Sequence, residues 1–155
     1  MPITIHRIKR VCPHCGERIR KLNPHHMDKP KVGVLMILAN ALQGGNGWVH
    51  CMEGEKAIVN GEVVRGPYLF RLYAMRSMWF GLTERREFGS GDYRITRKGI
   101  EFLKGDVGVP ATLYCKDGEV REQSEKIVFV GDVKNVVYDK EYWMNYFKVQ
   151  KWPAV

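Results

Sequence analysis

The chain has 155 residues, of which 45% are hydrophobic and 27% charged, and its formal net charge at pH 7 is +8. This composition is typical of a folded globular protein and argues against a disordered tail. The longest apolar run, residues 34–39, is far too short to cross a bilayer, and the N-terminus lacks the apolar core of a signal peptide. We therefore expect neither a membrane protein nor a secreted one.

The positive charge is concentrated in two parts of the chain. Residues 1–31 hold eight Lys or Arg and two acidic residues, which gives this segment a net charge of +6. A second basic cluster lies between residues 85 and 98. Clustered cations favour a polyanionic partner, because each one placed near a phosphate releases a condensed counterion.

The first half of the chain predicts two helices with a strand between them. A short strand is expected within residues 1–10, and a helix over residues 31–43, with Asp28 as its N-cap and Pro30 in its first turn. A strand follows over residues 48–52. Residues 53–65 predict only a turn and a short element, because Gly54 and Gly61 interrupt them and Gly66 follows.

The second helix is expected to begin after Pro67 and to run from residue 68 to residue 80. Tyr68, Leu72, Met75 and Trp79 recur at helical spacing, and we expect this stripe to be buried. Phe70, Ala74 and Met78 are then the apolar residues that lie away from the core.

A basic hairpin and a third helix are expected next. Residues 82–88 and 93–96 look like two strands joined by a Gly-Ser-Gly-Asp turn. Thr96 is the expected N-cap of a helix over residues 97–104, and Gly105 ends that helix.

The C-terminal part changes to a β-rich pattern. Residues 111–115 and 119–123 flank Asp117-Gly118, a strong hairpin signal, and residues 126–130 form a further β run. Asp139 is expected to cap a final helix. That helix carries an aromatic stripe: Tyr142, Trp143, Tyr146 and Phe147. Aromatic residues at this spacing more often pack in the core than bind a ligand.

The order helix, strand, helix, basic hairpin, helix is the layout of a winged helix-turn-helix. The segment Gly81-Leu-Thr-Glu-Arg-Arg-Glu-Phe, followed by Tyr93-Arg-Ile-Thr-Arg-Lys-Gly, resembles the wing and following helix of MarR-like regulators. The resemblance covers roughly residues 29–105. It implies that residues 68–79 form a recognition helix and residues 85–94 a wing, and it implies binding to double-stranded DNA.

On this interpretation the protein is a transcriptional regulator or accessory factor without catalytic activity. The expected base contacts are Arg71, Arg76 and Ser77, and the expected phosphate contacts are Arg85, Arg86, Arg94, Arg97 and Lys98. The apolar outer face of the second helix favours an alternative, a winged helix that docks a protein partner or a second copy of the chain. In that case Phe70 and Met78 would be the sensitive residues.

Cys12-Pro-His-Cys15-Gly has the spacing of a zinc knuckle. Two thiolates separated by two residues can hold one Zn²⁺, which would be structural here. A second Cys pair of this spacing is absent from the sequence, so the two further ligands must come from His25, His26, His50, Cys51 or Cys115. We expect Cys51 and one of His25 or His26, with His26 preferred, to supply them. Alternatively, Cys51 is a small buried residue, as we expect for Cys115.

As a whole, the chain resembles short proteins of phage origin that join a Cys-Pro-x-Cys-Gly knuckle to a winged helix and a small β-rich segment. The expected fold is α+β: a winged helix-turn-helix with an N-terminal zinc knuckle and a C-terminal β-hairpin extension. The expected segments are residues 1–28, 29–105 and 106–155.

One enzyme class fits part of the sequence. His25-His26, Asn40 and His50 loosely follow the spacing of HNH nucleases, in which a His activates water beside a metal ion. Against this, Asn40 falls within an apolar helix. The phosphate-binding and nucleophile motifs of other enzyme classes are absent from the sequence.

Overall fold

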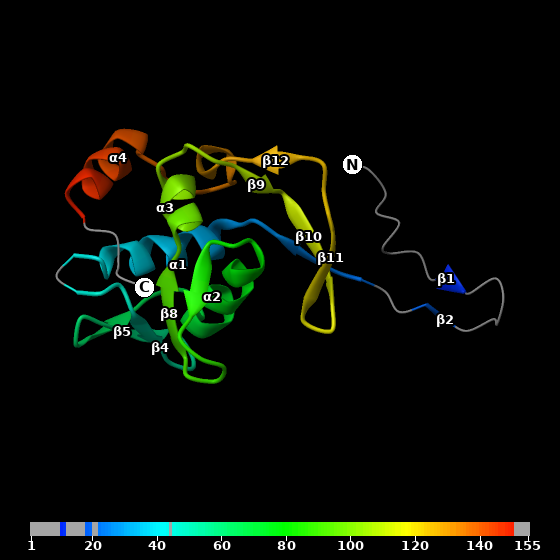
Figure 1. Ribbon diagram of the computed structural model, residues 1–155, viewed down its shortest axis with the longest axis horizontal. Coiled ribbons are helices and arrows are strands. Elements are labelled where there is room, and N and C mark those ends of the chain that lie inside the picture. Colours follow the sequence, from blue (N-terminus) through cyan, green and yellow to red (C-terminus); the bar gives the residue numbers. More distant parts are fainter. Residues whose placement is uncertain (1–9, 12–17, 20–21, 44, 151–155) are drawn as a thin grey trace.

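The structure is a computed structural model that describes residues 10–11, 18–19, 22–43 and 45–150 (Figure 1). It combines helices and antiparallel strands, so the expected α+β class is confirmed. At the N-terminal end, β1 (Arg10–Val11) pairs antiparallel with β2 (Arg18–Ile19). Cys12 and Cys15, the predicted knuckle thiols, lie outside the described residues, and so does most of the strand expected within residues 1–10.

Helix α1 (Lys29–Asn40) begins as its sequence predicts. The Asp28 carboxylate accepts a hydrogen bond from the Lys31 backbone N–H at 3.3 Å, and Pro30 lies in the first turn. Lys31 is 2% exposed, and its side-chain Nζ donates to the His26 carbonyl oxygen at 2.6 Å. This buried ammonium fastens the start of α1 to β3 (Asn23–His26).

A five-stranded antiparallel sheet lies beside α1, in the strand order β6-β5-β4-β8-β7. Its strands are β4 (Val49–Cys51), β5 (Lys56–Val59), β6 (Glu62–Arg65), β7 (Thr83–Arg85) and β8 (Asp92–Ile95). The β5–β6 hairpin occupies the stretch that predicted only a turn and a short element. Its two turn residues, Asn60 and Gly61, have φ of 49° and 83°, values typical of a tight two-residue hairpin.

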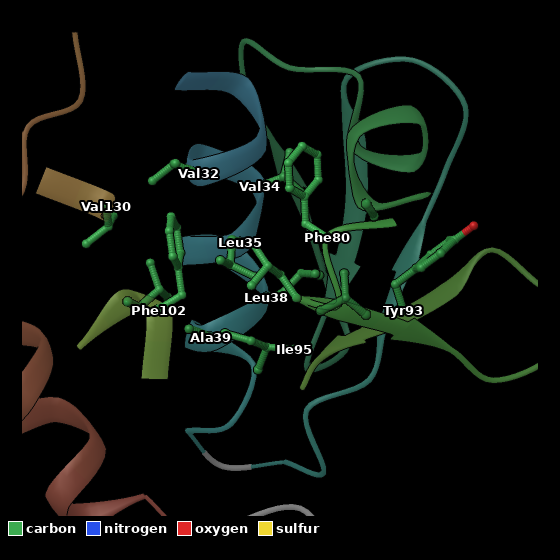
Figure 2. Close-up of a cluster of buried hydrophobic side chains, with 14 of the residues drawn as sticks. Val32, Val34, Leu35, Leu38, Ala39, Phe80, Tyr93, Ile95, Phe102 and Val130 are labelled. Atoms are coloured by element: carbon green, nitrogen blue, oxygen red, sulfur yellow. The ribbon is translucent and has the colours of Figure 1, made fainter. Parts of the chain in front are cut away.

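Helices α2 (Phe70–Trp79) and α3 (Arg97–Leu103) form close to their predicted positions. Thr96 caps α3 by accepting a hydrogen bond from the Gly99 N–H at 3.0 Å, as predicted. Figure 2 shows α1 in the middle of the core, between Phe80 and Tyr93 on one side and Phe102 and Val130 on the other. Side chains on two sides of α1 are therefore buried.

The C-terminal part is confirmed as a hairpin followed by a capped helix. Its elements are β9 (Val109–Pro110), β10 (Thr112–Lys116), β11 (Glu119–Gln123), β12 (Ile127–Val128), a 3-10 turn over Val130–Asp132 and α4 (Lys140–Val149). Asp117 and Gly118 turn the β10–β11 hairpin with φ of 54° and 76°, and Asp139 caps α4. Strand β10 also pairs with β3, so residues 23–26 and the C-terminal hairpin share one three-stranded sheet (Figure 1).

Two tyrosines fasten the C-terminal part to the helices. The Tyr138 hydroxyl donates to the Leu103 carbonyl at 2.5 Å, and the Tyr146 hydroxyl donates to the Ala39 carbonyl at 2.7 Å. Both carbonyls lie in the last turn of a helix, where the regular intrahelical N–H donors are missing. Burial, with a smaller contribution from Tyr142, raises the pKa of Tyr146 to about 12. None of the described helices is long and apolar enough to cross a membrane.

Candidate functional site

Helix α2 faces the core with a different stripe from the predicted one. Phe70, Ala74 and Ser77 are buried, at spacings of four and three residues. The predicted stripe is only partly buried, and Leu72 and Met75 line a pocket on the outer side. The prediction that Phe70 and Ala74 face outward is therefore wrong, because these two side chains pack in the core.

The hairpin that follows α2 carries an exposed aromatic residue at its tip. Between β7 and β8, Gly89 and Gly91 have φ near +80°, which glycine adopts without strain. Phe88 precedes them and is 87% exposed. The Arg85 guanidinium lies 4.7 Å from the centre of the Phe88 ring, a cation–π distance. A large apolar ring held in solvent in this way is typical of a contact residue.

A pocket of about 450 Å³ lies between α2 and this hairpin. The Arg71 guanidinium crosses from α2 and donates to the Gly89 carbonyl at 3.2 Å, which links the helix to the turn. The wall of the pocket is mostly apolar, with two guanidinium groups and one carboxylate. It is formed by Glu53, Gly54, Leu69, Arg71, Leu72, Met75, Arg85, Phe88, Gly89 and Tyr93.

We call the outer side of α2 and the adjoining hairpin tip the α2–hairpin surface: Leu69, Leu72, Met75, Trp79 and Phe88. Leu69 and Phe88 are exposed, and the other three are partly buried. Sequence periodicity assigned the helical members to the core and gave Phe88 no role. The available signal was an aromatic residue placed next to a glycine-rich turn, where a side chain has little structure to pack against.

The predicted basic cluster is divided between the two faces of the sheet. Successive strand residues point to opposite faces. Arg85 lies opposite Tyr93 and lines the pocket on the helix side. Arg86 and Arg94 lie on the other side, where their guanidinium groups are 4.6 Å and 4.5 Å from the Trp48 ring. The basic cluster therefore does not form one continuous surface for binding phosphates.

Two predicted DNA contacts are corrected by their burial. Arg94 is 6% exposed and donates to Glu84 at 3.3 Å, so it is an internal member of the sheet and not a phosphate contact. Ser77 is 1% exposed on the core side of α2, so it does not reach base edges. Arg71 and Arg76 are partly exposed, and Arg86, Arg97 and Lys98 are exposed.

Ser77 predicts a test of this helix orientation. Its hydroxyl is buried and has no hydrogen-bond partner within the described residues. An unpartnered buried hydroxyl costs about 1–3 kcal/mol, and Ala is also the better helix former. Ser77→Ala is therefore expected to raise the free energy of unfolding by about 1 kcal/mol, measured by urea denaturation. A loss of stability would show that the hydroxyl has a partner.

The predicted zinc ligands are only partly described. Cys12 and Cys15 lie outside the described residues, so zinc binding by this pair remains a prediction. His26 is exposed, and its Nδ1 lies 2.9 Å from the Thr112 hydroxyl. Cys51 is 0% exposed, and burial raises the pKa of its thiol to about 12.

The burial of Cys51 fits the alternative considered for it, a small buried residue, and its role as a zinc ligand stays a prediction because Cys12 and Cys15 lie outside the described residues. Cys115 is buried as predicted. Over residues 22–43 and 45–150, no three His, Cys, Asp or Glu side chains come together as a metal site.

The histidines of the nuclease hypothesis each have a separate partner in the structure. The ring centres of His25 and Trp79 lie 4.6 Å apart, and the His26 ring is hydrogen-bonded to the Thr112 hydroxyl. The Nδ1 atom of His50 lies 2.8 Å from the Asp92 carboxylate, on the exposed side of β4. These contacts join each histidine to a neighbouring strand or helix and do not gather them around a common point.

His25 makes stability depend on pH. Burial lowers its pKa below the usual 6.5, and the nearby Arg76 and Lys31 charges lower it further. The His25 imidazole then binds a proton more tightly in the unfolded chain than in the folded protein. The contribution of neutral His25 to the free energy of unfolding is therefore complete above pH 6.5 and is lost as the pH falls below 6.5. His25→Phe keeps an aromatic contact with Trp79. It is expected to lose less stability than the wild type between pH 8 and pH 5, measured by urea denaturation. Equal losses would contradict this assignment.

Comparison with family models, with curated proteins and with solved structures finds no match to this chain.

Proposed function

We propose that the protein is a binding module that docks a protein partner on the α2–hairpin surface. The observation that carries this proposal is the exposed Phe88 ring beside an apolar pocket of about 450 Å³. Contiguous exposed apolar surface next to a preformed pocket is characteristic of interaction sites. Arg71, Arg76 and Arg85 flank the surface, a residue type that is enriched at protein interfaces.

The proposed framework for this surface is a winged-helix-like body. Strands β7 and β8 take the place of the wing, β8 pairs with β4, and α2 packs against α1. The β5–β6 hairpin lies where a winged helix-turn-helix would place the helix before its recognition helix. In this arrangement α2 and the wing offer apolar groups to a partner, where a regulator would offer hydrogen-bonding groups to base edges.

Site-specific photocrosslinking in the host cell tests the docking function. The photoreactive amino acid p-benzoylphenylalanine is placed at Leu69 or at Phe88, and at Phe129 as a control that is 43% exposed on the C-terminal part. The same discrete protein adduct is expected from Leu69 and Phe88, but not from Phe129. Leu72→Asp, introduced beside each probe, should abolish the adduct. Adducts of equal yield from all three positions, or none from Leu69 and Phe88, would reject the proposal.

Double-stranded DNA is the second candidate partner. Arg71, Arg76 and Arg85 lie around the outer side of α2, and they could hold phosphates without reading bases. Because Arg85 and Arg86 lie on opposite faces of the sheet, they form a matched pair for this test. DNA binding through α2 predicts an affinity that falls steeply with salt, with Arg85→Glu weakening it and Arg86→Glu leaving it nearly unchanged. A docking module without DNA affinity predicts that neither variant matters.

A further inference from the structure

We propose that the pocket between α2 and the hairpin holds one large apolar side chain from an acidic segment of the partner protein. This inference rests on the proposed docking function, and it adds the chemistry of the segment that is recognised.

The size and lining of the pocket favour one anchoring side chain. Its volume of about 450 Å³ is at the lower end of the roughly 300–1,000 Å³ typical of sites that bury a small molecule. Leu72 and Met75 supply apolar wall from α2, and Tyr93 supplies an aromatic wall from β8. Interfaces concentrate their binding energy in a few aromatic or aliphatic side chains that fill such pockets.

The charges at the pocket favour carboxylates beside that anchor. Arg71 and Arg85 both line the wall, where Glu53 is the one carboxylate among the described residues. The Arg71 bond to Gly89 uses one of its five N–H donors. The Arg85 guanidinium carbon lies over the Phe88 ring, 4.7 Å from its centre, a cation–π contact beside the pocket that Arg85 lines. Planar guanidinium groups with remaining donors match carboxylate oxygens.

The surface around the pocket favours a protein segment over a small molecule. Leu69 and Phe88 line the pocket, yet they are 44% and 87% exposed, so most of the surface of Phe88 faces solvent. Trp79, further along α2, is only partly buried, with one side of its ring against His25. A ligand confined to the pocket would leave these groups in water, whereas a peptide segment crossing the pocket covers them.

Two matched synthetic peptides test the inference. The acidic probe carries a central Trp-Leu pair flanked by glutamates, and the basic probe has lysines at the flanking positions. Binding is followed by NMR of methionine methyl groups labelled with carbon-13, because Met75 lines the pocket and Met144 lies on α4 as an internal control. The protein variants are Arg71→Glu/Arg85→Glu and, as the control on the opposite sheet face, Arg86→Glu.

The acidic probe is expected to shift the Met75 signal and not the Met144 signal, and to bind about three- to tenfold more tightly than the basic probe. The Arg71→Glu/Arg85→Glu variant should reverse this preference, and Arg86→Glu should leave it unchanged. Equal affinity for both probes, or no shift of Met75 with either, would overturn the inference. The docking proposal fails separately, through the loss of crosslinked adducts at Leu69 and Phe88.

Discussion

Replacing Phe70 by Ala is expected to lower the free energy of unfolding by about 3–5 kcal/mol. Phe70 is 0% exposed on the buried side of α2, among the largest fully buried side chains of the core. Its removal loses the transfer free energy of the ring and leaves a cavity that the surrounding helices only partly fill. For a domain of this size the change corresponds to a fall in Tm of about 10 °C, which thermal and urea denaturation would both detect.

Phe88→Ala is the matched control, because it removes the same ring from an exposed position. Phe88 is 87% exposed, so its loss is expected to change stability by no more than about 0.5 kcal/mol. The same variant should weaken docking at the α2–hairpin surface, while Phe70→Ala acts through folding. Similar losses of stability in the two variants would show that the hairpin tip packs in the core and would remove the basis of the docking proposal.

The orientation of α2 could not be fixed by periodicity, because both sides of this helix are apolar. One stripe includes Leu72, Met75 and Trp79, and the other includes Phe70 and Ala74. The larger stripe predicted the core side, but close approach of helices favours small residues. Ala74 and Ser77 are buried, and α2 packs against α1. The bulkier stripe therefore faces the pocket and the outer surface.

Local signals predicted element boundaries well. Asp28, Thr96 and Asp139 each cap a helix through the side-chain hydrogen bond that their residue types favour. The same kind of signal, Asn60-Gly61, was present in the stretch that predicted only a turn and a short element. An Asn-Gly pair between strand-forming residues is among the strongest hairpin signals, so the β5–β6 hairpin could have been predicted.

The basic cluster shows why charge along a sequence differs from charge on a surface. Arg85 and Arg86 are neighbours in the sequence, but in a strand they point to opposite faces of the sheet. Arg85 lines the pocket. In contrast, the Arg86 guanidinium lies 3.7 Å from the Asp92 carboxylate and over the Trp48 ring. Period-two alternation alone predicts this separation. The burial of Arg94 required knowledge of its partners, Glu84 and Trp48.

The segment that most resembled a regulator, Tyr93 to Gly99, has a structural explanation in how β8 joins α3. Tyr93 and Ile95 are buried in the core, and Thr96 caps α3 through the Gly99 N–H. Gly99 is buried where α3 packs against the end of β8 and against Leu82, just before β7: a Cβ atom there would lie 2.4 Å from the Leu82 carbonyl oxygen and 2.6 Å from Ile95 Cγ1. The lack of a side chain at Gly99 therefore allows α3 to contact the sheet.

Gly99→Ala is consequently expected to destabilise the protein by about 1–3 kcal/mol or more, although Ala favours a helix over Gly by about 1 kcal/mol. The reason is that the carbonyl of Leu82 belongs to the backbone and cannot move aside as a flexible side chain would. Lys98→Ala, at the exposed neighbouring position of the same helix, is the control and should change stability by no more than about 0.5 kcal/mol. Urea denaturation measures whether Gly99→Ala lowers or raises the free energy of unfolding. A higher value would mean that α3 lies further from Leu82, because the greater helix propensity of Ala would then be the main effect.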